Sequence, residues 1–373
     1  MMQDEKYGGI RLASDQVNET AREPLAGRME TVLCDLCKSN ENDLLIRQRD
    51  LLLAVTDEEF RIVRCRQCGL VYLNPRPSSD LIGTYYPNVY YPPVATRARP
   101  PFQQQAKKLS STMKRWVLEE YYGYPSSEQS VFLRILKRVL LWPDKMLREF
   151  KGRHPLPWRG EGKVLDVGCG AGGNLKTLQD QGWEPHGIEI SEVAAAHARE
   201  LVTGNIHTGT LESAPFPPQS FDLILMSHSL EHLPSPVDAL RRVRRLLKDD
   251  GLLVVSVPNL NSLEFKLFGR WWFPLDPPRH FYHFDKRSFS GIIAQAGFRL
   301  HRFRTGISAI FLMASLDRFW KHRFRKDVPF RKLIDRLIAR PVSLIAGHLG
   351  YGTEITVYAV KQQDGMSIPP RAL

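Results

Sequence analysis

The stretch that most constrains the fold of this chain is VLDVGCGAGGNL, which runs from Val164 to Leu175. It opens as an aliphatic run, breaks into four glycines, and continues in a helical pattern. Such an order predicts a strand, a tight turn and a helix. Glycine lets the backbone turn sharply and leaves no Cβ to block a ligand, and the first N–H groups of a helix point into the same space. The stretch therefore predicts a site for a nucleotide-like cofactor.

The spacing of the glycines narrows the class of site. The stretch is Asp-x-Gly-x-Gly-x-Gly, which differs from the G-x-G-x-x-G of dinucleotide enzymes, and it lacks the Lys-Ser/Thr of a P-loop. An ordinary tight turn would explain the glycines alone, but two further motifs follow in order. HGIEIS ends a second predicted strand with Glu189, and an acid there can accept hydrogen bonds from ribose hydroxyls. The long motif GTLESAPFPPQSFDLILMSHSLEHL, from Gly209 to Leu233, comes next.

Together, the ordered motifs resemble the class I S-adenosylmethionine-dependent methyltransferases over about residues 161–305 and the last strand. The resemblance implies an α/β fold: a Rossmann-like, seven-stranded, mostly parallel sheet with helices on both faces. It places the last strand, residues 354–361, antiparallel between the fifth and sixth strands. It also implies S-adenosylmethionine (SAM) as the cofactor. The residues expected to bind SAM are Asp166, Gly168, Gly170, Gly172, Glu189, Leu211, Glu212, Ser227 and His228.

Histidines near the predicted fourth and fifth strands are the candidates for catalysis. Methyl transfer to a hydroxyl or an acidic carbon needs a base, and histidine titrates near pH 6.5. We predict His232 as that base, with Glu231 orienting it and His280 as the second candidate. The alternative is that the Glu-His pair is structural. The D/N-P-P-Y/F motif of amino methyltransferases belongs directly after the fourth strand, where this chain has Ser-His-Ser-Leu, so we do not expect methylation of a nitrogen base.

Four of the five cysteines form two Cys-x-x-Cys pairs: Cys34 with Cys37, and Cys65 with Cys68. No apolar run approaches the ~18 residues of a membrane-spanning helix, and the polar N-terminus has no apolar signal core, so we expect a cytoplasmic protein. Disulfides do not persist there, and two such pairs supply the four thiolates of a closed, structural zinc site. Four reduced, buried cysteines without a metal are the alternative.

The outer segments carry most of the net charge of +12. Residues 97–153 hold 13 basic and five acidic side chains, and residues 299–340 hold 12 and three. Such surfaces indicate an anionic partner, or a solvated charged face. Apolar residues at helical spacing over 129–141 predict a basic amphipathic helix, ended by Trp142 and Pro143, that packs on the protein or lies on a membrane surface. The tyrosines of TYYPNVYYPP, residues 84–93, are expected to pack between domains or to line a substrate opening.

The motifs divide the chain into seven parts. We expect a disordered N-terminus (1–28), a zinc-binding module (29–80), a basic helical connector (81–160), the Rossmann-like methyltransferase core (161–305), a helical insertion that caps the acceptor pocket (306–350), the last core strand (351–362) and a tail (363–373).

A cysteine module joined to such a core resembles bacterial methyltransferases that act on sugars. The leading prediction is O- or C-methylation of a sugar-containing or lipid-linked small-molecule intermediate, such as a glycolipid. The enzyme would work in the cytoplasm, with peripheral contact to the anionic inner surface of the membrane. The alternatives are an RNA methyltransferase that binds RNA through the module and the basic segments, and a non-enzymatic adaptor that binds a membrane or a partner. Nucleic acid is the less favoured partner, because the cysteine pairs lack interleaved aromatic and basic residues.

Overall fold

The computed structural model of the protein describes residues 29–78, 81–86, 101–128 and 130–362, with the backbone alone over 101–110. The predictions for residues 1–28 and 363–373 lie outside these ranges. So does most of the tyrosine-rich run, of which only Thr84, Tyr85 and Tyr86 are described.

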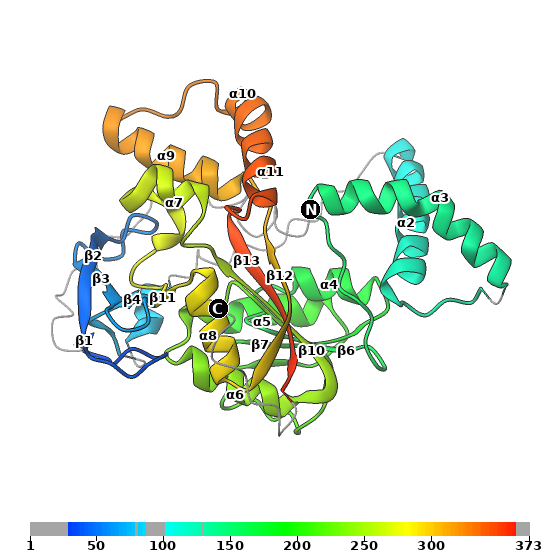
Figure 1. Ribbon diagram of the computed structural model, residues 1–373, viewed down its shortest axis with the longest axis horizontal. Coiled ribbons are helices and arrows are strands. Elements are labelled where there is room, and N and C mark those ends of the chain that lie inside the picture. Colours follow the sequence, from blue (N-terminus) through cyan, green and yellow to red (C-terminus); the bar gives the residue numbers. More distant parts are fainter. Residues whose placement is uncertain (1–28, 79–80, 87–100, 129, 363–373) are drawn as a thin grey trace.

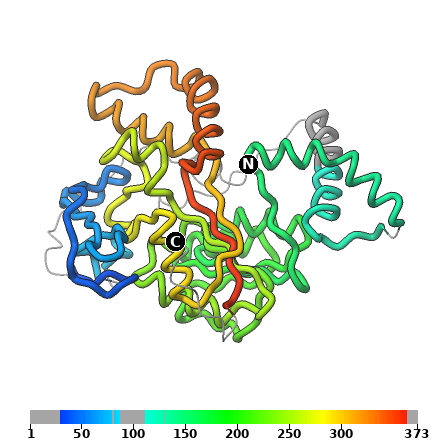
Figure 2. Tube along the Cα trace, viewed as in Figure 1, coloured from blue at the N-terminus to red at the C-terminus, as the bar shows by residue number. Residues whose placement is uncertain are grey.

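The largest sheet of the described residues has seven strands in the order β12-β13-β10-β9-β6-β7-β8. Its strands are β6 (Lys163–Val167), β7 (Glu184–Glu189), β8 (Ile206–Thr208), β9 (Phe221–Ser227), β10 (Leu247–Pro258), β12 (Phe298–Thr305) and β13 (Glu354–Lys361). From β8 to β10 neighbouring strands are parallel, whereas β13 runs antiparallel to both β10 and β12. Figure 2 shows this last strand, in red, crossing the centre of the molecule. The predicted α/β fold class and the antiparallel last strand are confirmed.

Both faces of the sheet are covered, which is why its central strand is apolar without alternation. Along β9, Ile224 and Met226 pack in one cluster with α6 and α8, whereas Leu223 and Leu225 pack in another that includes Leu178 of α4. The helices of the core are α4 (Gly173–Gln179), α5 (Glu192–Leu201), α6 (Pro236–Leu246), α7 (Leu263–Phe268) and α8 (Lys286–Gln295). Short 3-10 turns are η1 (Ile82–Tyr85), η3 (Leu230–His232), η4 (Gly269–Trp271) and η5 (Phe273–Leu275).

The cysteine-containing segment forms two small sheets beside the core, in blue in Figure 1. Its strands are β1 (Met29–Glu30), β2 (Asn42–Arg49), β3 (Glu59–Cys65), β4 (Val71–Leu73) and β5 (Arg76–Pro77). The second sheet, in the order β11-β4-β3-β2, takes its edge strand β11 (Tyr282–His283) from far along the chain. Apolar side chains of both parts pack in one cluster. The sequence boundary at residue 80 therefore runs through a continuous core.

Two groups of outer helices flank the central sheet (Figure 1). On one side, α2 (Pro101–Tyr122) packs against α3 (Val131–Phe150). Above the sheet in this view lie α9 (Ile310–Phe324), α10 (Arg331–Ile334), the π-helical turn η6 (Asp335–Ala339) and α11 (Arg340–His348). None of the helices among the described residues is both long enough and apolar enough to span a bilayer.

Helix α3 does not end at Trp142 and Pro143, as we predicted, but continues to Phe150 with Pro143 inside it. Proline removes one helical hydrogen bond and strains the preceding turn. The next turn is supported by two ion pairs at helical spacing, which offset part of that cost: Asp144 with Arg148 at 2.6 Å and Lys145 with Glu149 at 2.9 Å.

Candidate cofactor and acceptor site

The glycine turn joins β6 to α4 with an open space beside it. Gly168, Gly170 and Gly172 have φ values of 77°, 55° and 82°, a left-handed region that favours glycine. The Gly168 N–H donates to the carbonyl of Ile188 at 2.8 Å, which fastens the turn to β7. A Cβ on Gly168 would lie 2.7 Å from that of Ser229, whereas a Cβ on Gly170 would meet nothing within 4 Å. The open side of the turn is therefore at Gly170.

Two of the predicted acids lie at the carboxyl edge of the sheet beside this turn. Asp166 is fully buried in β6. Glu189 ends β7, and its carboxylate accepts hydrogen bonds from the backbone N–H groups of Gly170 at 2.8 Å and Ser191 at 3.0 Å. A carboxylate has about four lone-pair sites, so Glu189 can still accept from a ligand. The structure thus brings the predicted ribose-binding acid against the glycine turn.

The other predicted cofactor residues follow β8 and β9. Leu211 is buried and Glu212 is exposed, and the guanidinium of Arg242 donates to the carbonyl of Leu211 at 2.6 Å. Ser227 ends β9, where it pairs in register with Ser256 of β10. These positions share the carboxyl edge of the sheet with the glycine turn, where ligands bind in doubly wound folds.

The structure turns His228 toward two carboxylates. Its Nε2 lies 2.8 Å from Glu354 and its Nδ1 lies 3.4 Å from Glu231. Burial by itself would lower the pKa of this imidazole, but hydrogen bonds to the two carboxylates raise it to about 9. His228 is therefore an imidazolium at neutral pH. Glu354, at the start of β13, was not among the residues selected from the sequence.

His232 and His280 lie together, and the contacts of each ring define its tautomer. The Nδ1 of His232 is 3.0 Å from the carbonyl of Arg279 and 2.9 Å from the hydroxyl of Tyr86. A carbonyl can only accept, so Nδ1 carries the proton and Nε2 holds the lone pair. The Nδ1 of His280 likewise donates to the carbonyl of Pro274 at 2.8 Å. The two rings meet edge to face, with centroids 4.5 Å apart.

Burial keeps both of these rings neutral, whereas neighbouring imidazoles keep one carboxylate, Glu231, charged beside them. It lowers the pKa of His232, and that of His280 much further. Burial would raise the pKa of Glu231, but its hydrogen bond with His228 and the nearby rings lower it to about 2. We expected Glu231 to orient His232, but Glu231 contacts His228, and His232 is held by Arg279 and Tyr86.

One ligand atom from each of Glu231, His232 and His280 lies within 4.8 Å of the others, so these three residues could also hold a metal ion. One carboxylate and two neutral imidazoles are donor types that divalent metals accept.

Arg279 ties the loop between η5 and β11, residues 276–281, to the cysteine-containing segment. Its fully buried guanidinium donates to Asp50, in the loop after β2, at 2.6 and 2.9 Å, and to Asp276 at 2.6 and 3.0 Å. Asp50 and Tyr86 were both missed from the sequence. The tyrosine-rich run was a sequence signal that could have selected Tyr86, whereas no local sequence pattern indicates Asp50.

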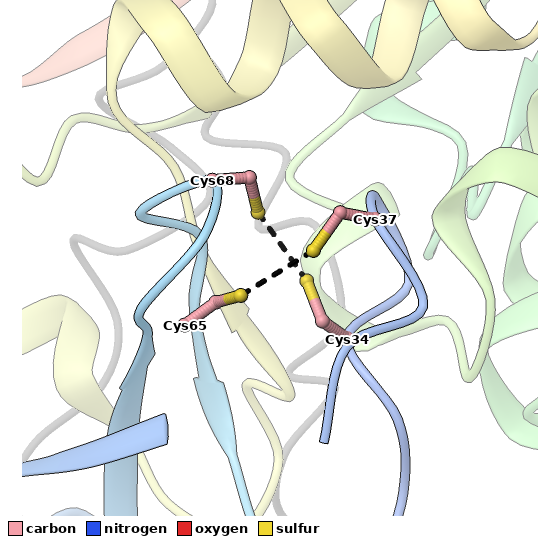
Figure 3. Close-up of side chains that lie close together, drawn as sticks. All are labelled: Cys34, Cys37, Cys65 and Cys68. Carbon is pink, nitrogen blue, oxygen red and sulfur yellow. Dashed lines mark hydrogen bonds between the residues drawn. The ribbon is translucent and has the colours of Figure 1, made fainter. Parts of the chain in front are cut away.

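The four paired cysteines converge on one point, with their side chains directed toward each other (Figure 3). The sulfurs of Cys34 and Cys68 are 3.4 Å apart, as are those of Cys37 and Cys65, and all four lie within 4.8 Å of one another. A tetrahedral zinc with Zn–S bonds of about 2.3 Å needs sulfurs at about this spacing. Asp35, between the first two cysteines, accepts from the N–H of Val237 at 3.0 Å in the first turn of α6.

Comparison with known proteins matches residues 134–302 to a family model described as a methyltransferase domain. A Bacillus subtilis protein named "Uncharacterized methyltransferase YcgJ" is 38% identical over 99 residues, which cover 25% of this chain and 39% of that protein. A ubiquinone biosynthesis O-methyltransferase of Yersinia enterocolitica is 35% identical over 27% of this chain and 44% of its own length. The chain thus spans less than half the length of these curated relatives. A solved SAM-dependent methyltransferase of Mesorhizobium loti is 20% identical, with a TM-score of 0.40, over 59% of this chain and 97% of that one.

Proposed function

We propose that this chain, whose residues 134–302 match a methyltransferase domain, transfers a methyl group from SAM to an oxygen or carbon of a sugar-containing or lipid-linked small molecule. The observation that carries the proposal is the neutral His232, whose Nε2 holds a lone pair at the carboxyl edge of the sheet. Oxygen is favoured as the acceptor atom because ubiquinone biosynthesis O-methyltransferases are among the similar proteins. The enzyme would act in the cytoplasm and meet lipid-linked acceptors at the inner membrane surface.

The residues beside the glycine turn fit SAM. The space next to Gly170 is open and would take a ligand, and a side chain at position 170 would enter that space. Asp166 and Glu189 would hold the two polar ends of SAM, with Leu211 and Glu212 beside the adenine, and Ser227 and His228 at the edge of the crevice. When bound, SAM supplies a methyl group on a sulfonium that is already activated, so the protein's part is to align the acceptor and to exclude water.

The acceptor-side residues provide a place for the proton. As the acceptor oxygen or carbon bonds to the methyl group, its proton passes to Nε2 of His232, which becomes an imidazolium. The anionic Glu231 next to it stabilises that charge. His280 is the second candidate base, but it is only 8% exposed, whereas His232 is partly exposed.

We further propose that Cys34, Cys37, Cys65 and Cys68 bind a structural zinc ion. Four thiolates leave no open coordination position, so the metal would contribute folding energy rather than chemistry. Its effect would reach the acceptor side, because β4 of this segment pairs with β11, which begins two residues after His280. The N–H of Leu73 also donates to the carbonyl of Phe281 at 2.8 Å.

The test uses purified full-length protein and SAM labelled in its methyl group, offered to nucleotide sugars, glycolipids and RNA. We expect label in the sugar or glycolipid fraction. H232N should lose at least about 100-fold of this activity, the usual contribution of a general base. It should keep thermal stabilisation by SAM, which is about 2.7 kcal/mol at one hundred times the dissociation constant.

His301→Asn is the matched control, because this side chain is exposed on β12. It should leave both activity and SAM stabilisation at wild-type values. Label found only in RNA would overturn the acceptor class, and an absence of stabilisation by SAM would favour a non-enzymatic adaptor.

A further inference from the structure

Helix α3 presents a broad apolar face to solvent. At 3.6 residues per turn, Phe132, Leu136, Val139, Met146 and Phe150 lie along one stripe of the helix. All five are exposed, with Phe132 at 73% and Val139 at 66%. The large apolar side chains of α3 that are exposed are Val131, Phe132, Leu133, Ile135, Leu136, Val139, Leu140, Trp142, Met146, Leu147 and Phe150. An exposed apolar surface of this extent indicates a face that another surface covers.

The apolar stripe runs into a basic hollow of about 880 Å³. The hollow lies between the last turns of α3, the edge strand β12 and the end of α11. The stripe's final members, Met146 and Phe150, line it directly. The cationic side chains that line the hollow are Lys266, Lys286, Arg302 and Arg304.

The charge of this hollow is largely unneutralised. Its one carboxylate, Glu149, already pairs with Lys145 at 2.9 Å. Lys266 lies 3.7 Å from the ring centre of Tyr351, and Lys286 lies 5.1 Å from that of Phe303. Across the described part of the chain, none of the two lysines and two arginines of the hollow forms an ion pair with a carboxylate. The hollow therefore attracts an anion.

We propose that the apolar stripe of α3 and the basic hollow together form a docking surface for a bilayer that contains anionic phospholipids. Phosphate headgroups would enter the hollow, while the stripe would lie at the boundary of headgroups and acyl chains, as amphipathic basic helices do. Neither half alone specifies this partner, because a soluble anion needs no apolar stripe and an apolar protein partner needs no cationic hollow.

The surface lies near the proposed reaction edge. Asn259 follows β10 and Thr305 ends β12, and both line the hollow. Because β10 and β12 run in the same direction, these ends share the carboxyl edge of the sheet with the glycine turn. Docking would thus bring a bilayer to the edge where a lipid-linked acceptor has to arrive. The inference deepens the proposed function by naming the surface that meets lipid, and its test needs no methyl transfer.

The test is co-sedimentation of the full chain with vesicles of phosphatidylcholine alone or mixed with phosphatidylglycerol. We expect at least about tenfold tighter binding to the mixed vesicles, weakening as salt rises. Each basic residue near an acidic membrane contributes about 1 kcal/mol, a factor of about five, so the double variant K266A/R302A should bind about 25-fold more weakly. Val139→Asp, at an exposed position, should also abolish binding.

Matched controls are Leu337→Asp in η6 and Arg241→Ala in α6, which are exposed and lie outside the surface. They should bind vesicles as the wild type does. Equal binding to both kinds of vesicle, or full binding by V139D, would overturn the proposal. The proposal would also be overturned if V139D converted a dimer into a monomer without changing lipid binding, because a second copy of the chain would then cover the stripe.

Pyrophosphate and SAM provide two further measurements. If the protein failed to bind mixed vesicles while pyrophosphate bound equally to the wild type and to V139D, the hollow would be assigned to a soluble anion. This result would overturn the proposal of a lipid partner. Thermal stabilisation by SAM tests the proposed function separately. Vesicle binding without stabilisation by SAM would support the docking surface and contradict the methyltransferase proposal.

Discussion

Replacing Arg279 by methionine tests whether the loop between η5 and β11 depends on the cysteine-containing segment. The guanidinium is fully buried and bridges Asp50 and Asp276, with four hydrogen bonds of 2.6–3.0 Å. Methionine keeps much of the volume but leaves two buried carboxylates without their cation. Removal of one partner from a buried ion pair costs about 3–5 kcal/mol, and the upper end of that range is expected here.

The loss is measured by urea unfolding and by the melting temperature. For 373 residues at about 2.1 cal/mol/K per residue, a loss of 3–5 kcal/mol corresponds to about 4–6 °C. Asp50→Asn should cost less, about 1–3 kcal/mol, because Arg279 keeps its contact with Asp276. Turnover should fall in R279M because the loop that carries His280 loses its anchor, while the metal content of the cysteine cluster should stay unchanged.

The control is Arg331→Met, which removes an ion pair with Asp317 in which the arginine side chain is 52% exposed. Exposed pairs contribute about 0–1 kcal/mol, so this variant should melt within about 1 °C of the wild type. If R279M also stays within about 1 kcal/mol of the wild type, the buried cluster does not hold the two parts together and the reasoning is refuted.

Further predictions concern pH, the glycine turn and the metal. The pKa of His228 is about 9 in the folded protein, against 6.5 in the unfolded chain. This difference stabilises the fold by about 3 kcal/mol below pH 6.5, and the stabilisation should be lost as the pH rises through 9. Urea unfolding of E354Q at several pH values should show a weaker pH dependence over that range. G168A should be less stable than G170A, because a Cβ on residue 168 would lie 2.7 Å from the Cβ of Ser229. G170A should lose only about 1–2 kcal/mol of stability, the cost of a positive φ. Calorimetry should show that G170A binds SAM more weakly than the wild type. C65S, or chelation of the wild type, should release about one zinc per chain by atomic emission and lower the melting temperature; an unchanged melting temperature after metal loss would count against a structural zinc.

Local patterns of the sequence predicted single strands and turns of the central sheet, whereas its seven-stranded, mostly parallel arrangement was implied by the resemblance to class I methyltransferases. The turn at Gly168, Gly170 and Gly172 needs positive φ angles that few other residues adopt, so the glycines by themselves predict its conformation. Likewise, the apolar run of β9 identifies a strand buried on both faces. The convergence of the four cysteines also followed from their spacing, while the zinc itself stays a prediction.

The surroundings of the candidate catalytic histidines were decided only by tertiary structure. Arg279 meets Asp50 across 229 positions, and His228 meets Glu354 across 126. Strand β11 joins a sheet whose other strands all precede residue 74. The free energy of such contacts comes from burial and charge pairing between distant segments, which leaves no periodicity in either one. Sequence could therefore select His232 and His280 as candidates, but only the packed chain determines which imidazole is neutral, which is charged, and which ring nitrogen carries the proton.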